Sequence, residues 1–165
     1  MSNDETWKIG EQMAQEFMKK AGYKIVYTNF AERGFELDIV AILPKKIQLK
    51  KLKTDTKKKI VELKEKLKTD NKKDKIKAKI KLLKNNISKV KSTLKDLLVI
   101  TEVKSRADDR FGKGCECIDL KKRSHLIRGA KYLTQMQEFK GMQVRFDVAS
   151  VDYNKITYIE NSFSC

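Results

Sequence analysis

The sequence is poor in the residues that define several classes of protein. It holds three cysteines, one proline and one histidine among 165 residues. So few cysteines, in an odd number, do not form a disulfide framework, and the spacing of Cys115 and Cys117 is not that of the common zinc or redox pairs. One histidine leaves little for a Ser-His-Asp triad or a histidine-based zinc site. These scarcities exclude most disulfide-rich, zinc-binding and triad-based proteins.

Long apolar runs are absent as well. No run approaches the roughly 18–20 residues that span a bilayer, and the first five residues are polar and acidic, unlike a signal peptide. We therefore expect a soluble cytoplasmic protein with no membrane partner.

Positive charge is concentrated in one third of the chain. The chain has 38 basic and 22 acidic residues, for a net charge of +16. Between Lys45 and Leu98 there are 21 lysines, no arginine and 6 acids, so this segment alone carries +15. The remaining 111 residues are almost neutral. The composition thus divides the chain into a balanced part and a strongly basic insertion.

The basic segment has a hydrophobic period of its own. In its second half the apolar residues alternate at spacings of 4 and 3, which is a heptad seam, and in its first half the spacing is less regular. A polar stretch, residues 69–74, separates the halves. The pattern predicts an inserted antiparallel helical hairpin (coiled coil) over residues 45–97. The seam positions are Leu49, Leu52, Thr56, Ile60, Leu63 and Leu67, then Ile76, Ile80, Leu83, Ile87, Val90, Leu94 and Leu97.

The rest of the chain reads as a compact α/β domain made of residues 1–44 and 98–165. Helical periodicity and β-rich runs alternate along it, with Gly22 and Pro44 as end signals. We predict helices over residues 6–21 and 118–139 and strands over residues 24–30, 35–43, 98–105, 144–151 and 156–159.

Acidic residues on two of these strands predict a polar centre. If the strands pair, Asp38 and Glu102 converge in a partly buried spot, with Lys104 about 6.6 Å further along the same face. Two desolvated carboxylates repel each other, and Mg²⁺, which prefers oxygen ligands, would remove that repulsion. Lys104 would then stabilise a metal-bound hydroxide or hold a phosphate, and Glu11, near the apolar stripe of the first helix, offers a further acid. This is the equipment of metal-assisted phosphodiester hydrolysis.

A structural interpretation stays open beside the catalytic one. Glu-Val-Lys is a common tripeptide on strands, so Glu102 and Lys104 are equally compatible with an ordinary surface ion pair. The ordered set of acids on a helix and two strands raises the weight of the catalytic interpretation. Asp147, by contrast, is interpreted as a buried structural acid.

Outside residues 45–98, nearly the whole chain resembles the YraN family of bacterial proteins. The motifs that carry the resemblance follow one another in the family's order. They are Ile9-Gly10-Glu11, Ala21-Gly22-Tyr23, Gly34-Phe35-Glu36-Leu37-Asp38-Ile39-Val40-Ala41, Thr101-Glu102-Val103-Lys104-Ser105-Arg106, Phe111-Gly112, Lys121-Lys122-Arg123, Arg145-Phe146-Asp147-Val148 and Ile159-Glu160-Asn161-Ser162-Phe163. That family is similar to archaeal Holliday junction resolvases and belongs with the restriction-endonuclease-like, PD-(D/E)xK, nucleases.

The resemblance implies a fold and a set of roles. The fold would be a restriction-endonuclease-like mixed central sheet flanked by helices. Asp38 and Glu102, helped by the Val103 carbonyl, would bind Mg or Mn. Lys104 would position or activate the attacking water, and Glu11 would bind or orient the metal. The family usually joins the two strands by a short turn, whereas 54 residues intervene here; the insertion is expected to leave the site intact.

We therefore expect an endonuclease acting on structured or branched DNA, with a homodimer as a compatible assembly. DNA is favoured over RNA as the partner. The alternative is a non-catalytic nucleic-acid-binding or protein-interaction module that retains the nuclease fold. The lysines of the insertion either contact duplex phosphates or form the solvated face of a coiled coil. The candidate phosphate contacts near the site are Arg106, Lys121, Lys122, Arg123 and Arg128.

Overall fold

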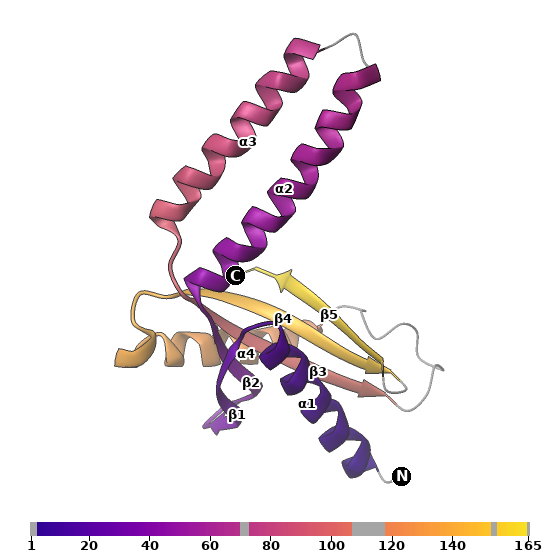
Figure 1. Cartoon of the computed structure of the whole chain (residues 1–165). Coiled ribbons are helices and arrows are strands. Elements are labelled where there is room, and N and C mark those ends of the chain that lie inside the picture. Colours follow the sequence, from indigo (N-terminus) through magenta and orange to yellow (C-terminus); the bar gives the residue numbers. More distant parts are fainter. Residues whose placement is uncertain (1–2, 70–72, 107–117, 153–154, 165) are drawn as a thin grey trace. The chain divides into compact units, whose positions relative to one another are not determined.

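The chain folds into two compact units. The computed structural model describes residues 3–69, 73–106, 118–152 and 155–164 (Figure 1). One unit comprises residues 1–44 with 96–165, and the other comprises residues 45–95. Cys115, Cys117 and the Phe111-Gly112 motif lie outside the described residues. Within the described ranges, no helix is both long enough and apolar enough to cross a membrane.

A mixed five-stranded sheet forms the centre of the first unit. Its strands lie in sequence order, and every neighbouring pair is antiparallel except β3 and β4, which are parallel. A parallel pair needs a long crossover, and α4 lies within it. The predicted α/β class is confirmed. The strands are β1 (Lys24–Glu32), β2 (Phe35–Leu43), β3 (Leu97–Arg106), β4 (Gln143–Asp152) and β5 (Lys155–Phe163).

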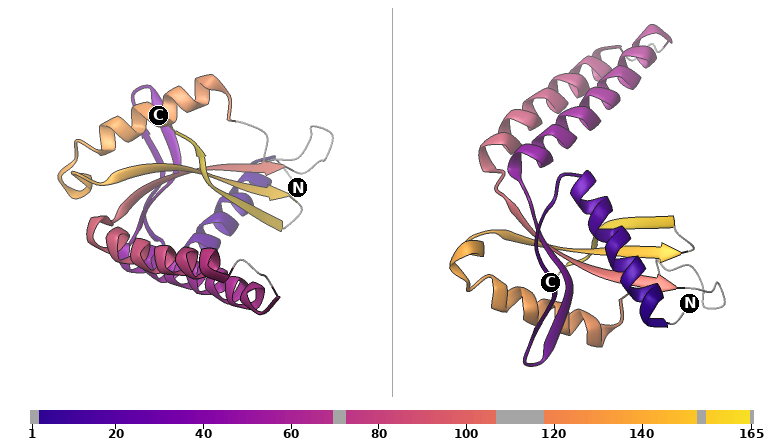
Figure 2. Two further views of the ribbon diagram at one scale, coloured as in Figure 1. Left: turned by 90° about the horizontal axis from the view of Figure 1, so that it is seen from above. Right: turned by 60° about the horizontal axis from the view of Figure 1, so that its bottom comes forward.

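One helix covers each face of this sheet. Figure 2 shows α1 (Asn3–Lys20) and α4 (Leu120–Leu133) on opposite sides of it. From α4, Leu126, Ala130 and Leu133 join the buried cluster of sheet residues. On the other face, α1 contributes the fully buried side chains of Ala14 and Met18. Because both faces are covered, β2 and β3 are near-continuous apolar runs rather than alternating ones.

The second predicted helix of this unit is shorter than expected. It ends at Leu133, and a single 3-10 turn follows (η2, Gln137–Phe139). Met136, between them, has an extended backbone, so the chain changes direction there. That change returns Phe139 to the core, where it is fully buried. The apolar pattern continued through the break because both segments face the same core.

Two helices make up the second unit, α2 (Lys45–Thr69) and α3 (Lys73–Thr93), which pack against each other. The residues of the heptad seam are buried or half-buried along both helices, with Thr56 and Ile76 the most enclosed. Every lysine of this unit whose side chain is described is exposed. The apolar period therefore marks the inward stripe of each helix.

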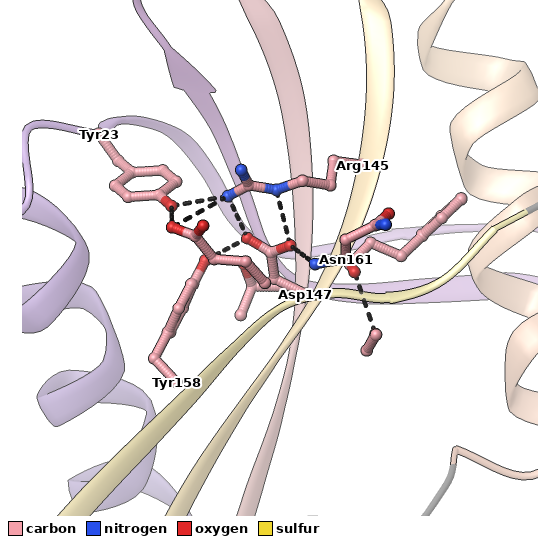
Figure 3. A network of polar contacts seen from close by, with 9 residues as sticks. Tyr23, Arg145, Asp147, Tyr158 and Asn161 are labelled. Atoms are coloured by element: carbon pink, nitrogen blue, oxygen red, sulfur yellow. Dashed lines mark hydrogen bonds and ion pairs between the residues drawn. The ribbon is translucent and has the colours of Figure 1, made fainter. Parts of the chain in front are cut away.

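A buried polar network ties β4 and β5 to Tyr23, which lies between α1 and β1. Asp147 is fully buried, and Figure 3 shows the donors around its carboxylate. Arg145 donates to both of its oxygens, from Nε at 2.8 Å and from NH2 at 2.6 Å. The Tyr158 hydroxyl and the Asn161 N–H donate at 2.8 and 2.9 Å. Arg145 also donates to the Tyr23 hydroxyl, whose pKa burial raises to about 12. Protein donors thus reach both oxygens of Asp147, which supports the structural interpretation of this acid.

We expect Asp147→Ala to lower the free energy of unfolding by about 3–5 kcal/mol. The change leaves the half-buried Arg145 guanidinium without its main counter-ion and removes the acceptor of two further donors. Urea denaturation followed by circular dichroism measures the effect. The control is Glu16→Ala, which removes an exposed partner of Lys20 and should cost less than about 1 kcal/mol. Equal losses in the two variants would contradict the assignment.

Candidate functional site

The pairing of β2 with β3 brings Asp38 and Glu102 together. The ladder runs from Leu43 opposite Leu97 to Ile39 opposite Thr101, and one further step would set Asp38 opposite Glu102. The ladder stops before that step. Instead, the Asp38 carboxylate accepts a hydrogen bond from the Val103 N–H, with 2.7 Å between Oδ2 and the nitrogen. A side chain of one strand therefore replaces a backbone acceptor and fixes the carboxylate at the end of the ladder.

The two carboxylates are buried and interact. Asp38 is 8% exposed and Glu102 is 6% exposed. Burial, and then the negative charge of Asp38, raise the pKa of Glu102 to about 7. Burial also raises the pKa of Asp38, although the Val103 N–H and the charge of Lys122 oppose that rise. The pair is therefore reluctant to carry two negative charges.

Lys122, in the first turn of α4, supplies the cation of this centre. Asp119 caps the helix by accepting from the Lys122 N–H, which sets the direction of the turn. The Lys122 ammonium then lies 2.9 Å from Glu102 Oε2 and 3.7 Å from Asp38 Oδ1. Burial would lower the pKa of Lys122, but its close contact with Glu102 and the charges of the two acids raise it. Lys122 is thus a protonated partner of both carboxylates.

The oxygen atoms of the site are incompletely satisfied. Glu102 Oε2 is buried and, within the described part of the chain, receives no well-directed hydrogen bond. Its contact with Lys122 is short but poorly directed, so we regard it as an ion pair in which the oxygen's lone pairs stay largely unused. A buried acceptor in that state has a desolvation cost of about 1–3 kcal/mol. The carboxylate oxygens of the site can therefore bind a cation that uses these lone pairs more fully than Lys122 does.

The residues present fit a hard divalent cation. Mg²⁺ is bound through oxygen atoms, commonly from one or two carboxylates with water completing the shell. Asp38 and Glu102 supply two carboxylates. Among residues 3–69, 73–106, 118–152 and 155–164 there is no group of three or more acidic, cysteine or histidine side chains that could hold a metal. Any ion would thus rely on two carboxylates, backbone oxygen and water.

Glu11 and Lys104 occupy different positions relative to this pair. The Glu11 carboxylate, on α1, accepts a hydrogen bond from the Asn29 amide at 3.0 Å, and the structure does not gather it with Asp38 and Glu102. Lys104 follows Glu102 by two residues on β3 and shares its face of the sheet. It is half-buried, opposite Ser150 of β4.

The predicted basic patch divides into cations with different partners. Lys122 points to the carboxylates, whereas Lys121 beside it is exposed. Arg123 Nε donates to the Ile118 carbonyl at 2.8 Å, and its guanidinium lies over the Phe163 ring.

Of the two remaining arginines, Arg128 lies on α4 and Arg106 is the last residue of β3. Arg128 donates to the Gly34 carbonyl at 2.9 Å, in the turn that joins β1 and β2. The backbone of Arg106 is opposite Asp152 in the ladder, and its side chain lies outside the described residues. Arg128 thus supports the protein's own turn.

Sequence reasoning placed Lys122 among phosphate contacts and missed its position at the carboxylates. A signal was available in the helix. Lys122, Leu126, Ala130 and Leu133 recur at spacings of 4, 4 and 3, which places them on one stripe. A lysine on the inward stripe of a helix that packs on two acidic strands is a candidate partner for them.

The chain belongs to the family described as Uncharacterised protein family UPF0102, whose model matches residues 10–88 and 77–151. This confirms the resemblance to the YraN family. The UPF0102 protein of Clostridioides difficile (strain 630) is 33% identical over 165 residues, covering 99% of this chain and 100% of that protein. The UPF0102 proteins of Persephonella marina and Caldicellulosiruptor saccharolyticus are each 28% identical, over 156 and 169 residues. These matches cover 94% and 99% of this chain and 90% and 100% of those proteins, and their names state no activity.

Without metal at pH 8, we expect Glu102→Gln to raise the free energy of unfolding by about 1–3 kcal/mol. The Glu102 pKa rises from its ordinary 4.5 to about 7 on folding, so the charged form opposes folding. The stabilising contribution of the protonated form is complete below pH 4.5 and is lost as the pH rises through 7. The gain of the variant should therefore vanish near pH 4.5. Urea denaturation in EDTA at both pH values measures it, with the exposed Glu36→Gln as control. A gain that is equal at both pH values would contradict this account.

Proposed function

We propose that this protein is a divalent-metal-dependent endonuclease that hydrolyses phosphodiester bonds of structured or branched DNA. The observation that carries the proposal is the buried pair of Asp38 and Glu102, held at the end of a strand ladder with the Lys122 ammonium against both carboxylates. Burying like charges is costly unless a cation offsets them. A site of this kind is typical of residues retained for chemistry rather than for stability.

The architecture supports a restriction-endonuclease-like fold. A mixed five-stranded sheet has one helix on each face, and the two acids lie on adjacent antiparallel strands. In this proposal residues 1–44 and 98–165 are the nuclease-like core. Residues 45–97 are a lysine-rich helical hairpin inserted between the two acidic strands.

Mg or Mn is the proposed cofactor. Asp38 and Glu102 would hold it. Glu102 Oε2, which receives no well-directed hydrogen bond from the described residues, is the atom best placed to gain from it. The Val103 carbonyl is a further ligand candidate, because the N–H and C=O of a strand residue point to the same side and the N–H points at Asp38. When bound, the metal would supply Lewis-acid activation and charge neutralisation at the phosphate.

The chain's own cations would act on the attacking water and on the phosphate. Lys104 shares the face of Glu102, so its ammonium is the proposed group that positions the water. Glu11 remains a proposed orienting acid and would have to release Asn29 to act at the metal. Lys121, exposed at the start of α4, is the proposed phosphate contact nearest to Lys122, and Arg106, Arg123 and Arg128 complete the proposed DNA-contact set.

One observation favours a non-catalytic module as the second candidate. The Lys122 ammonium already lies between the two carboxylates, at the place where a metal would lie. A protein that retained the fold for binding alone could keep this internal ion pair permanently. The response of Lys122 to metal therefore separates the two functions.

We expect Asp38→Asn to abolish metal binding and to reduce DNA cleavage at least 100-fold. The change removes one of two carboxylate ligands and leaves the size of the side chain nearly unchanged. Calorimetric titration with Mn²⁺ measures binding, and cleavage is followed on junction, flap, duplex and single-stranded DNA. The matched control is Glu36→Gln, an exposed acid two residues earlier on β2, which should retain both properties. Cleavage of none of these substrates by the unaltered protein, or activity that persists in Asp38→Asn, would overturn the proposal.

We expect Lys122→Met to lower the free energy of unfolding by about 3 kcal/mol in EDTA and to regain that stability in Mn²⁺. Removing one partner of a buried charge set leaves the others uncompensated, and a cation that binds only the folded state restores stability by mass action. Thermal denaturation with and without Mn²⁺ measures both effects. Lys121→Met, at the exposed neighbour, should show neither effect. A Lys122→Met protein that Mn²⁺ does not stabilise would favour the non-catalytic module.

A further inference from the structure

The lysines of α2 are distributed unevenly around the helix. Successive residues turn by about 100°, and the inward stripe runs through Leu52, Thr56 and Leu63. About a quarter turn or more past this stripe, in the direction of increasing residue number, lies a row made only of lysines. Of the acids of α2, Asp55 and Glu62 fall on the opposite flank, and Glu65 lies on the outward side, directly opposite the inward stripe. The lysine row of α2 is Lys46, Lys50, Lys53, Lys57 and Lys64.

The same arrangement recurs on α3. Its inward stripe runs through Ile76, Ile80 and Leu83. A second row of lysines lies on the flank that follows this stripe in the same rotational sense. Asp74 adjoins this row and lies 3.7 Å from the Lys77 ammonium. The lysine row of α3 is Lys73, Lys77, Lys81, Lys84 and Lys91.

The two rows lie on one side of the helix pair. Figures 1 and 2 show α2 and α3 side by side and antiparallel. Viewed from the N-terminal end of α2, successive residues of α2 turn clockwise and those of α3 turn anticlockwise, while the two inward stripes point at each other. On each helix, the flank that follows the inward stripe in the direction of increasing residue number therefore lies on the same side of the helix pair. We call this side, which carries both rows, the lysine face.

The lysine face is a surface of one charge sign, whereas the opposite side is mixed. All ten lysines of the face are exposed. The opposite side combines seven lysines with the acids of α2; these lysines are Lys51, Lys58, Lys59, Lys66, Lys75, Lys79 and Lys89. On that side the acids offset nearly half of the lysine charge, while on the lysine face Asp74 is the only acid to do so among the described residues. The +15 charge of the segment is therefore directed, not spread evenly.

The length and chemistry of the face fit a nucleic acid duplex. Lys46 and Lys64 are 18 residues apart, which corresponds to about 27 Å along the helix. A duplex presents one phosphate charge per about 1.7 Å of its axis, so a rigid row of ammonium groups meets a regular row of partners. The segment has neither arginine nor aromatic residues, so it lacks the side chains that read base edges or stack on bases.

A lipid surface fits the same face less well. Helices that bind membranes bury an apolar face in the lipid. Here the apolar residues are turned inward between α2 and α3. The exposed Val61 and Leu82 lie on different flanks of their helices and do not form a common patch.

We propose that the lysine face binds the phosphate backbone of duplex nucleic acid without sequence preference. Binding arises from ion pairs and the release of counter-ions, so it needs no metal and no carboxylate at the first unit. The face would give the protein an affinity for DNA that does not depend on cleavage.

The test compares two variants of the full chain with the same net charge. The face variant carries Lys53→Gln, Lys57→Gln, Lys81→Gln and Lys84→Gln. The control variant carries Lys51→Gln, Lys58→Gln, Lys75→Gln and Lys89→Gln. Each lowers the net charge by four with two changes per helix, so only the side of the helix pair differs. Fluorescence anisotropy with a 30-base-pair duplex in EDTA, over a range of salt concentrations, measures affinity and its salt slope.

We expect the face variant to lose at least tenfold in affinity at 50 mM salt and its salt slope to fall by about 3, since each phosphate contact contributes about 0.9. The control variant should stay within threefold of the unaltered protein. Equal losses in the two variants, or an unchanged face variant, would overturn the proposal. A result in which the face variant binds phosphatidylserine-rich vesicles more weakly than the unaltered protein, but binds the duplex equally well, would also overturn it.

Circular dichroism checks that each variant stays helical, which we expect because glutamine matches lysine in helix propensity. If a fourfold variant unfolds, two double variants replace the pair. Lys53→Gln with Lys57→Gln is then the face variant, and Lys51→Gln with Lys58→Gln is the control. The same comparison applies, with about half the expected change in the salt slope. Because EDTA removes metal, a failure here is distinct from a failure of the nuclease proposal.

Discussion

The closeness of two buried carboxylates is the constraint on which the site depends. Asp38 and Glu102 lie at the end of the β2–β3 ladder, where burial disfavours both charges and each charge disfavours the other. The Val103 N–H and the Lys122 ammonium offset part of this cost. The capped first turn of α4 brings this ammonium to the pair.

The contrast between two acidic centres in one sheet separates structure from function. Thr101 and Glu102 are adjacent on β3 and project to opposite faces. Thr101 reaches the Tyr158 hydroxyl and so joins the Asp147 network, in which both carboxylate oxygens have donors. Glu102 keeps a buried oxygen to which no residue in the described part of the chain donates a well-directed hydrogen bond. A satisfied acid stabilises the fold, whereas an unsatisfied pair is the place where a ligand gains most.

Local periodicity explains what could be predicted from the sequence. Strand alternation placed Asp38 and Glu102 on converging faces, and the heptad spacing identified the inward residues of α2 and α3. The break in the second helix and the partners of Lys122 and Arg128 depend on how α4 packs on the sheet. That packing is set by contacts between residues far apart in the chain, which no local pattern records. The lysine face similarly required knowing that two helices lie antiparallel.

Anomalous diffraction from crystals grown with Mn²⁺ tests the central claim most directly. The account predicts a single strong peak within about 2.3 Å of carboxylate oxygens from both Asp38 and Glu102, with the Lys122 ammonium moved away from Glu102. A map with no peak at these oxygens, and with Lys122 still against Glu102, would contradict it.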